Sequence, residues 1–204
     1  HIAFSCFSAY YGNTTWKLNN TGIYQPGNAM LAMEVMRYLF RENARTARWR
    51  EALSELKWAG RMEEVLPGVY VDGAHNISAV EAFLQSIPQD EHGNIILFSA
   101  VKDKEYEKMA AALCRGMRAE AYVVTHIEDP RGTRSEQLGD IFRKYTDSPV
   151  IVRENVKDAL LWVLENRESR RVYCLGSLYL TGMIKELIQE VKSDAELRRR
   201  VKEV

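Results

Sequence analysis

The stretch VYVDGAHN, residues 69–76, indicates how most of this chain folds. It begins as a short apolar strand, passes through a polar turn that contains a glycine, and leads into an amphipathic segment that ends near residue 87. The same order recurs along the chain, with further strands expected at residues 95–98, 122–124, 150–152 and 172–175. Strands that are apolar throughout are typical of a sheet covered on both faces. The sequence therefore predicts an α/β fold, a Rossmann-like, doubly wound and mostly parallel sheet with helices on both faces.

The segments between these strands have the spacing and the start signals of helices. Apolar side chains within residues 106–113 recur every three or four positions, as one face of a helix does. Thr133 followed by Glu136 fits a capping box, so we expect a helix to begin at Thr133. Asn155 followed by Asp158 approximates the same pattern. Each start lies shortly after or before a predicted strand, which supports the alternating order.

The first residues of the chain differ from the rest in their residue types. Residues 2–11 are aromatic and β-prone, residues 12–15 are turn-like, and residues 16–25 are consistent with a second short strand. Pro-Gly-Asn at 26–28 then opens a helix that we expect to end near Phe40. A hairpin with one helix is too small to be stable alone, so we expect the hairpin to pack on a neighbour or on the sheet domain.

We therefore divide the chain into four parts. Residues 1–45 form the hairpin and its helix, and residues 46–57 form a charged linker helix. Residues 58–191 form the sheet domain, and residues 192–204 form a charged C-terminal helix. This division gives one complete domain, residues 58–191, preceded by an N-terminal segment that is too small to be a domain of its own.

Composition and charge exclude several classes of protein. Of the 204 residues 46% are hydrophobic, and 28 Lys and Arg balance 28 Asp and Glu. Zero net charge argues against a general nucleic-acid or anionic-membrane partner. No apolar run approaches the roughly 18 residues of a membrane-spanning helix. The three cysteines have no CxxC spacing and are typical of reduced, buried thiols, so we expect a cytoplasmic protein.

Polar side chains follow the first and last strands of the predicted sheet, where open α/β sheets bind their ligands. Asp72 and His75 flank two small residues that let a ligand approach the backbone. Alternatively, Asn76 caps the next helix and His75 is a solvated loop residue. Ser177 is suited either to hold a carboxylate or phosphate or to act as a simple helix cap.

Two more groups of charged residues lie near strand ends. Arg61 suits a phosphate, because a guanidinium binds oxyanions in a bidentate way, but it could equally pair with a glutamate at 63–64. His126, Asp129 and Arg131 form either a second polar cluster or a solvated loop.

Several signatures are absent from these 204 residues. No G-x-x-x-x-G-K-[ST] loop occurs, and no G-x-G-x-x-G follows a strand. The four histidines are scattered, and no metal-ligand spacing appears, so we expect no metal site. A hydrolase triad of Ser177, His75 and Asp72 is disfavoured because no G-x-S-x-G turn is present. The chain therefore has no glycine-rich loop of its own that would bind a triphosphate or a dinucleotide.

Four motifs in order along the chain suggest a family. They are WAGRME at 58–63, VDGAHN at 71–76, VKDK at 101–104 and LGSLYL at 175–180. Together they closely resemble the C-terminal domain of folylpolyglutamate synthase, including its bifunctional dihydrofolate synthase form, in the Mur ligase superfamily. GIYQPGNA at 22–29 is similar to the segment that closes the family's central ATPase domain, except that Tyr24 replaces the usual His. Ala59 likewise stands where Pro is common.

This resemblance implies an ATP-dependent ligase that phosphorylates a carboxylate of folate or dihydropteroate, after which the amine of L-glutamate attacks the acyl phosphate. By motif position it places Asn28, Arg61 and Asp72 at the nucleotide. It places His75 and Ser177 at the incoming glutamate. It names no catalytic residue in this chain.

The resemblance also implies what lies outside the chain. The family's P-loop, its Mg²⁺ ligands and its main folate site belong to the N-terminal ATPase part, of which residues 1–45 would be the tail. ATP and Mg²⁺ would then act in the full-length enzyme. We expect this chain alone to bind neither and to be inactive.

Two other functions remain open at this level. One is a binding module that holds an amino acid or nucleotide without chemistry. The other is a Mur-type ligase that joins an amino acid to a cell-wall precursor. The DGAHN and GSLYL motifs favour the folate enzyme over the cell-wall ligase.

Overall fold

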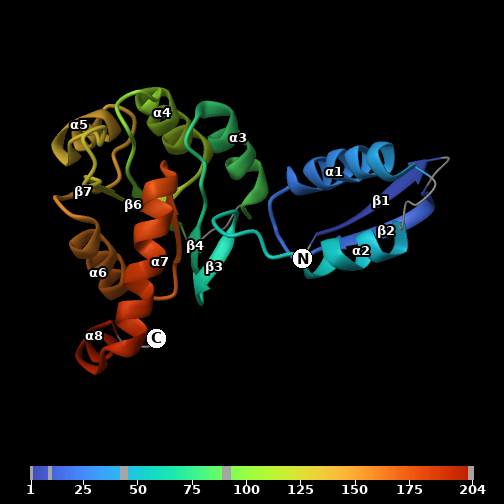
Figure 1. The fold of residues 1–204 in the computed structure, drawn as a ribbon. Coiled ribbons are helices and arrows are strands. Elements are labelled where there is room, and N and C mark those ends of the chain that lie inside the picture. Colours follow the sequence, from blue (N-terminus) through green and yellow to red (C-terminus); the bar gives the residue numbers. More distant parts are fainter. Residues whose placement is uncertain (1, 9–10, 42–45, 89–92, 202–204) are drawn as a thin grey trace. The chain divides into compact units, whose positions relative to one another are not determined.

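A computed structural model describes residues 2–8, 11–41, 46–88 and 93–201 (Figure 1). The chain divides into two compact units, His1–Arg61 and Met62–Val204, and each is described by itself. In the part of the chain that the structure describes, no helix is both long and apolar enough to span a membrane.

The second unit contains a six-stranded sheet. Its strands in spatial order are β3 (Glu63–Leu66), β4 (Val69–Val71), β8 (Arg171–Leu175), β5 (Asn94–Phe98), β6 (Ala119–Thr125) and β7 (Val150–Arg153). β3 runs antiparallel to β4, and every other neighbouring pair is parallel. The predicted α/β class and all five predicted strands are thereby confirmed.

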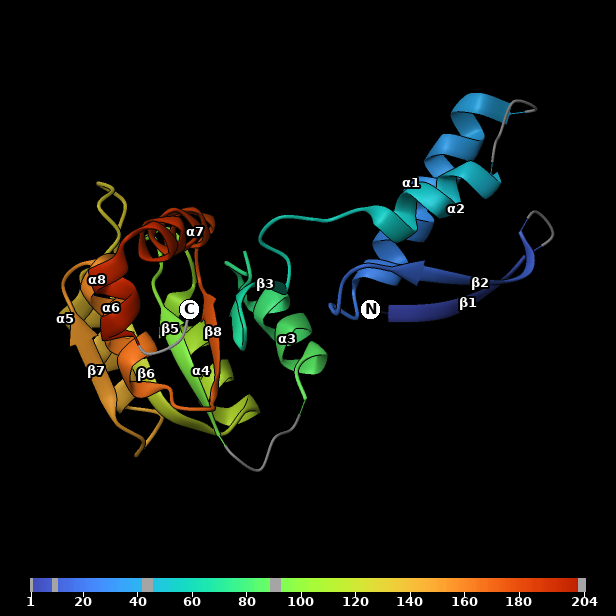
Figure 2. The ribbon, with the colours of Figure 1, turned by 90° about the horizontal axis from the view of Figure 1, so that it is seen from below.

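Helices cover both faces of this sheet (Figure 2). One face packs on α3 (Ile77–Ser86), α4 (Tyr106–Gly116) and α5 (Ser135–Arg143), and the other on α6 (Val156–Asn166), α7 (Leu178–Ser193) and α8 (Ala195–Arg200). The apolar sequence of β5 follows from its burial on both faces of the sheet. Ile96 and Phe98 join the first core, whereas Ile95 and Leu97 join the second. All five residues of β5 are buried, as both-sided coverage requires.

The edge strand β3 was not predicted, because its four residues begin with two glutamates. Glu63 is accommodated by Lys185 of α7, whose Nζ lies 2.8 Å from Glu63 Oε1. Glu64 accepts a hydrogen bond from the amide of Gly68 at 2.8 Å. Charged side chains are common on edge strands, where they hinder pairing with other chains. β3 therefore lacks the apolar run by which the other five strands, including the opposite edge strand β7, were predicted.

One of the two predicted helix starts is right and the other is wrong. Asn155 caps α6, since its Oδ1 accepts a hydrogen bond from the amide of Asp158 at 2.8 Å. Thr133 does not cap α5, which begins at Ser135 without a side-chain cap. Thr133 is buried instead, and its amide donates to the carbonyl of Ala100 at 2.9 Å. Contacts with a neighbouring loop thus override the local capping pattern.

The C-terminal segment is less solvated than its charge suggests. α7 continues to Ser193, and Asp194 caps the short helix α8 by accepting hydrogen bonds from two amides. Val201 is buried and belongs to the core on that face of the sheet. Leu197 of α8 also packs against this core, so apolar contacts hold this highly charged end.

The first unit is a hairpin covered by two helices of its own. β1 (Ile2–Ser8) pairs with β2 (Gly12–Leu18), followed by α1 (Gln25–Phe40) and α2 (Thr46–Glu55). The expected turn at residues 12–15 is wrong, because those residues pair with β1 from Ser8↔Gly12 onward. Thr14 and Thr15 in this segment are β-branched, and such residues favour a strand. Buried Tyr11, Trp16 and Met33 form a small core.

α1 carries an apolar face that its own unit leaves exposed. The side chains along it recur every three or four residues and are 50–73% exposed; they are Leu31, Val35, Tyr38 and Leu39. Apolar stripes of this kind usually mark an interaction surface.

The three cysteines are free thiols. Cys174 lies buried on β8, and burial raises the pKa of its thiol to about 12. Cys6 and Cys114 are half-buried, so the expectation of buried thiols is confirmed fully only for Cys174.

Candidate functional site

Two loops meet where β4 and β8 end. β4 pairs with β8 in parallel, so their carboxyl ends reach the same edge of the sheet. The amide of Gly176 donates to the carbonyl of Ala74 at 2.9 Å. The hydroxyl of Thr181 on α7 donates to the carbonyl of Asp72 at 3.3 Å. The structure therefore joins the loop that carries Asp72 and His75 to the loop that carries Ser177.

Asp72 organises its loop through its carboxylate. It is buried, with Oδ1 accepting from the amide of Ala74 at 2.8 Å and Oδ2 accepting from the amide of Met62 at 2.9 Å. Hydrogen bonds from amides to a buried charged acceptor are stronger than those to neutral ones. Asp72 thus fixes the turn in which His75 stands.

Asp72→Asn tests this structural role. The substituted amide would turn an NH₂ group toward one of the two backbone N–H donors and leave it unpaired in a buried place. We expect the free energy of unfolding of this unit to fall by about 1–3 kcal/mol. Urea denaturation followed by circular dichroism measures it. Asp147→Asn, at an exposed position, is the control; equal stability of the two variants would contradict the role.

His75 is positioned by its own loop. It is half-buried, and its Nδ1 lies 2.8 Å from the carbonyl oxygen of Gly73. A carbonyl can only accept, so Nδ1 carries the proton and Nε2 is left for a ligand. Asn76 caps α3 through its Oδ1, which accepts from the amide of Ala79 at 2.9 Å. The cap predicted as the alternative is therefore present, while His75 is oriented rather than freely solvated.

Ser177 caps α7. It is buried, and its Oγ accepts from the amide of Tyr179 at 3.1 Å. The predicted cap is confirmed, and it leaves the hydroxyl proton of Ser177 available for a second partner. Gly176, just before it, has φ +107°, a conformation that glycine adopts without strain.

Asn28 and Arg61 belong to the first unit. Asn28 is exposed on α1 and lines a small pocket of about 130 Å³ with Leu18, Ala29 and Trp58. Its Nδ2 donates to Oε1 of the buried Gln25 at 3.2 Å. Gln25 and Trp58 were not predicted as site residues, although both lie inside motifs that the sequence singles out.

Arg61 is half-buried at the end of the same unit. The Nδ2 of Asn20 donates to its carbonyl oxygen at 2.6 Å. Its guanidinium Nη1 donates to the carbonyl of Gly60 at 3.4 Å, a long hydrogen bond. This leaves most of the donors of the guanidinium to other partners.

The second polar cluster is partly assembled. Arg131 Nε lies 3.2 Å from Asp129 Oδ1, and its guanidinium lies over the ring of Tyr179 at 5.2 Å. The backbone amide of Arg131 also donates to Asp129 Oδ1 at 2.8 Å, and this hydrogen bond, followed by that from the side chain, lowers the pKa of Asp129. His126 bonds instead to the carbonyl of Thr133 at 3.1 Å and faces a different groove.

The resemblance implies Mg²⁺ in the full-length enzyme. Within the described residues, no group of three or more His, Cys, Asp or Glu is placed to hold a metal ion. Both oxygens of Asp72 are already bonded to amides. These residues therefore do not fit a magnesium site.

Comparison with known proteins decides the family. The model of the Mur ligase glutamate ligase domain matches residues 60–178, which is more than half of the chain. The chain belongs to this family. The predicted resemblance is thereby confirmed, and the matched region contains both loops at the ends of β4 and β8.

Individual relatives agree with this family. The dihydrofolate synthase/folylpolyglutamate synthase of Bacillus subtilis is 29% identical over an alignment of 176 residues, and the match covers 82% of this chain and 40% of that protein. The folylpolyglutamate synthase of Mycobacterium tuberculosis, complexed with ADP and AMPPCP, shares the fold with a TM-score of 0.75 and 23% identity; the match covers 85% of this chain and 42% of that one. The folylpolyglutamate synthase of Thermotoga maritima gives a TM-score of 0.67 at 26% identity, over 92% and 44%. This Mur ligase domain chain thus spans less than half the length of these relatives.

Proposed function

We propose that this chain supplies the C-terminal part of an ATP-dependent ligase that joins L-glutamate to folate or dihydropteroate. The observation that carries the proposal is the match to the glutamate ligase domain over both loops at the ends of β4 and β8. The relative from Bacillus subtilis, named as such a synthase, supports the choice of substrate.

The proposed reaction has two steps. The terminal phosphoryl group of ATP passes to a carboxylate oxygen of the folate substrate, which gives an acyl phosphate and ADP. The amine of L-glutamate then attacks the acyl carbon, the amide bond forms, phosphate leaves and the amine releases a proton. This chain contributes by holding glutamate so that its amine reaches the acyl carbon, which is catalysis by positioning.

His75 and Ser177 would hold the glutamate. With Nδ1 committed to the carbonyl of Gly73, the ring of His75 is held in place and its Nε2 is left for a ligand. Ser177 still has a hydroxyl proton to donate to a carboxylate after capping α7. The bond between Gly176 and Ala74 keeps the two loops in register, so the two side chains form one preorganised pair.

The pocket beside Asn28 would hold the adenine base. Because Asn28 Nδ2 is engaged by Gln25 Oε1, Asn28 Oδ1 remains an acceptor and Gln25 Nε2 remains a donor. This matches the amine donor and ring-nitrogen acceptor of adenine. Trp58 is 56% exposed and offers an aromatic face to the base. Arg61 would meet the phosphates, and Asp72 would act through the shape of its loop.

Asn28→Ala tests the nucleotide side. In a full-length ligase that carries this chain, we expect the KM for ATP to rise about tenfold, because one hydrogen bond to the base is worth roughly 1.4 kcal/mol. The KM for L-glutamate should stay within twofold. Steady-state kinetics measures both. Asn166→Ala, at the end of α6, is the amide control; an unchanged KM for ATP in Asn28→Ala would remove Asn28 from the site.

The exposed apolar face of α1 is consistent with a missing neighbour. Residues 1–45 would be the tail of a central ATPase domain whose remaining part covers Leu31, Val35, Tyr38 and Leu39. The 204 residues contain no P-loop, and a ligase of this kind needs one to hold the triphosphate.

The proposal is tested by comparing the chain alone with a fused ligase. In the fused ligase, this chain replaces the matching part of the Bacillus subtilis relative. We expect no ATP-dependent glutamate addition by the chain alone and measurable addition by the fused ligase. Robust turnover by the chain alone, or none by a folded, ATP-binding fused ligase, would contradict the proposal.

A further inference from the structure

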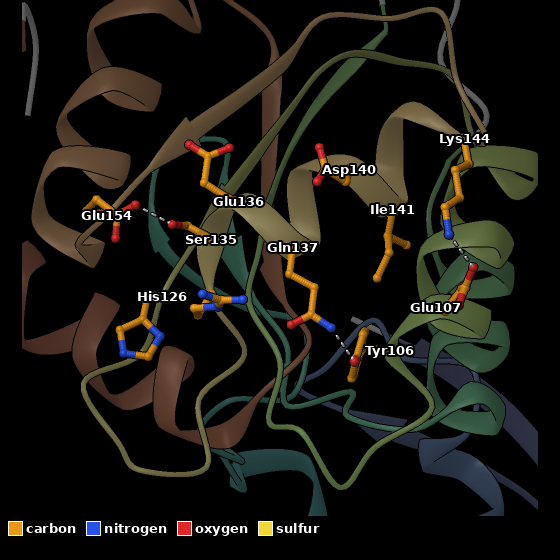
Figure 3. Close-up of a pocket in the computed structure, with 11 residues that line it drawn as sticks. Tyr106, Glu107, His126, Ser135, Glu136, Gln137, Asp140, Ile141, Lys144 and Glu154 are labelled. Atoms are coloured by element: carbon orange, nitrogen blue, oxygen red, sulfur yellow. Dashed lines mark hydrogen bonds and ion pairs between the residues drawn. The ribbon is translucent and has the colours of Figure 1, made fainter.

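A polar groove of about 780 Å³ lies along α5, at the carboxyl ends of β5, β6 and β7 (Figure 3). Tyr106 at the start of α4, His126 after β6 and Glu154 after β7 contribute to its walls. None of the residues proposed for ATP or glutamate lines it. Its volume falls in the range of small-molecule sites, and its place at the carboxyl edge is where open sheets bind ligands.

Three side-chain contacts hold the walls of the groove. Ser135 Oγ donates to Glu154 Oε1 at 2.8 Å, and Gln137 Nε2 donates to the hydroxyl of Tyr106 at 3.0 Å. Lys144 Nζ donates to Glu107 Oε1 at 3.1 Å, and this hydrogen bond lowers the pKa of Glu107. Figure 3 shows these pairs on both sides of α5. These groups are therefore already satisfied within the protein.

Two charged groups in the groove remain without such contacts. Arg134, at the cap position of α5, and Glu136, in its first turn, make no side-chain hydrogen bond or ion pair with the described residues. The Nδ1 of His126 donates to the carbonyl of Thr133 at 3.1 Å, which leaves its Nε2 as an acceptor. The groove thus offers one cation, one carboxylate and one ring nitrogen to a ligand.

The charged side chains that line the groove indicate which chemical class of ligand it favours. Four carboxylates line the groove against two cationic side chains, namely Glu107, Glu136, Asp140 and Glu154 against Arg134 and Lys144. Asp140 is paired with Arg143, whose Nη1 lies 2.9 Å from Asp140 Oδ1, so the groove keeps an excess of one negative charge. This excess of negative charge disfavours phosphates and oligoglutamate. An ammonium group is favoured beside Glu136, while Arg134 can take a single carboxylate in a bidentate way.

We propose that this groove is a binding site for a zwitterion that carries an ammonium and a carboxylate group, that is, a free amino acid or a short peptide. Arg134 binds the carboxylate, and Glu136 binds the ammonium group. The site is separate from the one proposed for the glutamate substrate and does not depend on that proposal.

Matched ligands test the proposal on the 204-residue chain by isothermal titration calorimetry. L-glutamate is compared with glutarate, which lacks the ammonium group, and L-lysine with cadaverine, which lacks the carboxylate. Glycylglycine serves as the short peptide. We expect at least one zwitterion to bind saturably and its truncated partner to bind at least about tenfold more weakly.

Variants locate the binding. Arg134→Gln and Glu136→Gln should each weaken zwitterion binding about tenfold, whereas Glu81→Gln on α3 should not. His75→Ala separates this site from the proposed substrate site and should leave the binding intact. The proposal is overturned by absence of saturable binding by all three zwitterions, by equal binding of the truncated ligands, or by binding that His75→Ala removes and Arg134→Gln spares.

Discussion

His75→Ala in the fused ligase is expected to raise the KM for L-glutamate by roughly 10- to 100-fold. The ring of His75 is held by the bond from Nδ1 to the carbonyl of Gly73, so its Nε2 stands in a fixed place. Loss of a preorganised hydrogen bond to a charged substrate costs about 1.5–3 kcal/mol. Because the proposed contact is to glutamate alone, the KM for ATP should change less than twofold. Steady-state kinetics with each substrate varied in turn measures the split.

Glu81→Ala is the control for this variant, since Glu81 is exposed on the helix that follows His75. Its KM for both substrates should equal that of the parent. A rise in the KM for ATP in His75→Ala that matches the rise for glutamate would show a general loss of the loop instead. An unchanged KM for glutamate would remove His75 from the glutamate site.

Gly176→Ala is expected to lower the free energy of unfolding of the Met62–Val204 unit by about 3 kcal/mol or more. Gly176 has φ +107°, which an L side chain rarely adopts. An added Cβ would lie 2.2 Å from the carbonyl oxygen of Ser99 and 2.6 Å from the ring of Phe98. Phe98 is the last residue of β5 and Ser99 follows it directly; both are fully buried and cannot move without disturbing the sheet.

Gly182→Ala on α7 is the matched control. Apart from its chain neighbours and the backbone of its own helix, no heavy atom lies within 4 Å of the Cβ that this change adds, and the position is helical. Alanine there should raise the free energy of unfolding by about 0.5–1 kcal/mol. Urea denaturation of the two variants compares them directly. Equal stability of Gly176→Ala and the parent would show that the loop after β8 is not constrained as described.

The central strands could be predicted because their sequence reflects their burial. β5 and β8 are covered on both faces, so nearly every residue in them is apolar and the pattern is unmistakable. β3 lies at the edge and begins with Glu63, whose charge is balanced by Lys185, distant in sequence. No local pattern encodes that partner.

Local capping signals were reliable only where no other segment intervened. Asn155 and Ser177 cap their helices as their residue types suggest. Thr133 has an equally good pattern, but its amide and carbonyl bond to Ala100 and His126, and α5 begins two residues later. Tertiary contacts therefore decided the boundary.

The candidate sites also divide into residues that the sequence could predict and residues that only the folded chain brings together. His75 and Ser177 stand next to predicted strand ends, so the parallel sheet alone places their loops at one edge. The groove along α5 could not be foreseen, because Tyr106, Arg134 and Glu154 come from three separate segments. The pocket beside Asn28 also depends on Trp58, which only the folded first unit brings near α1.

The identity of the amino acid that the fused ligase consumes tests the central claim most directly. The measurement is mass spectrometry of the folate product after incubation with ATP and each of a panel of amino acids that includes L-glutamate, D-glutamate, L-aspartate and L-alanine. We predict an ATP-dependent amide with L-glutamate, and that this product is lost at the same glutamate concentration in His75→Ala. Transfer of another amino acid in preference to L-glutamate would contradict the assignment of this domain.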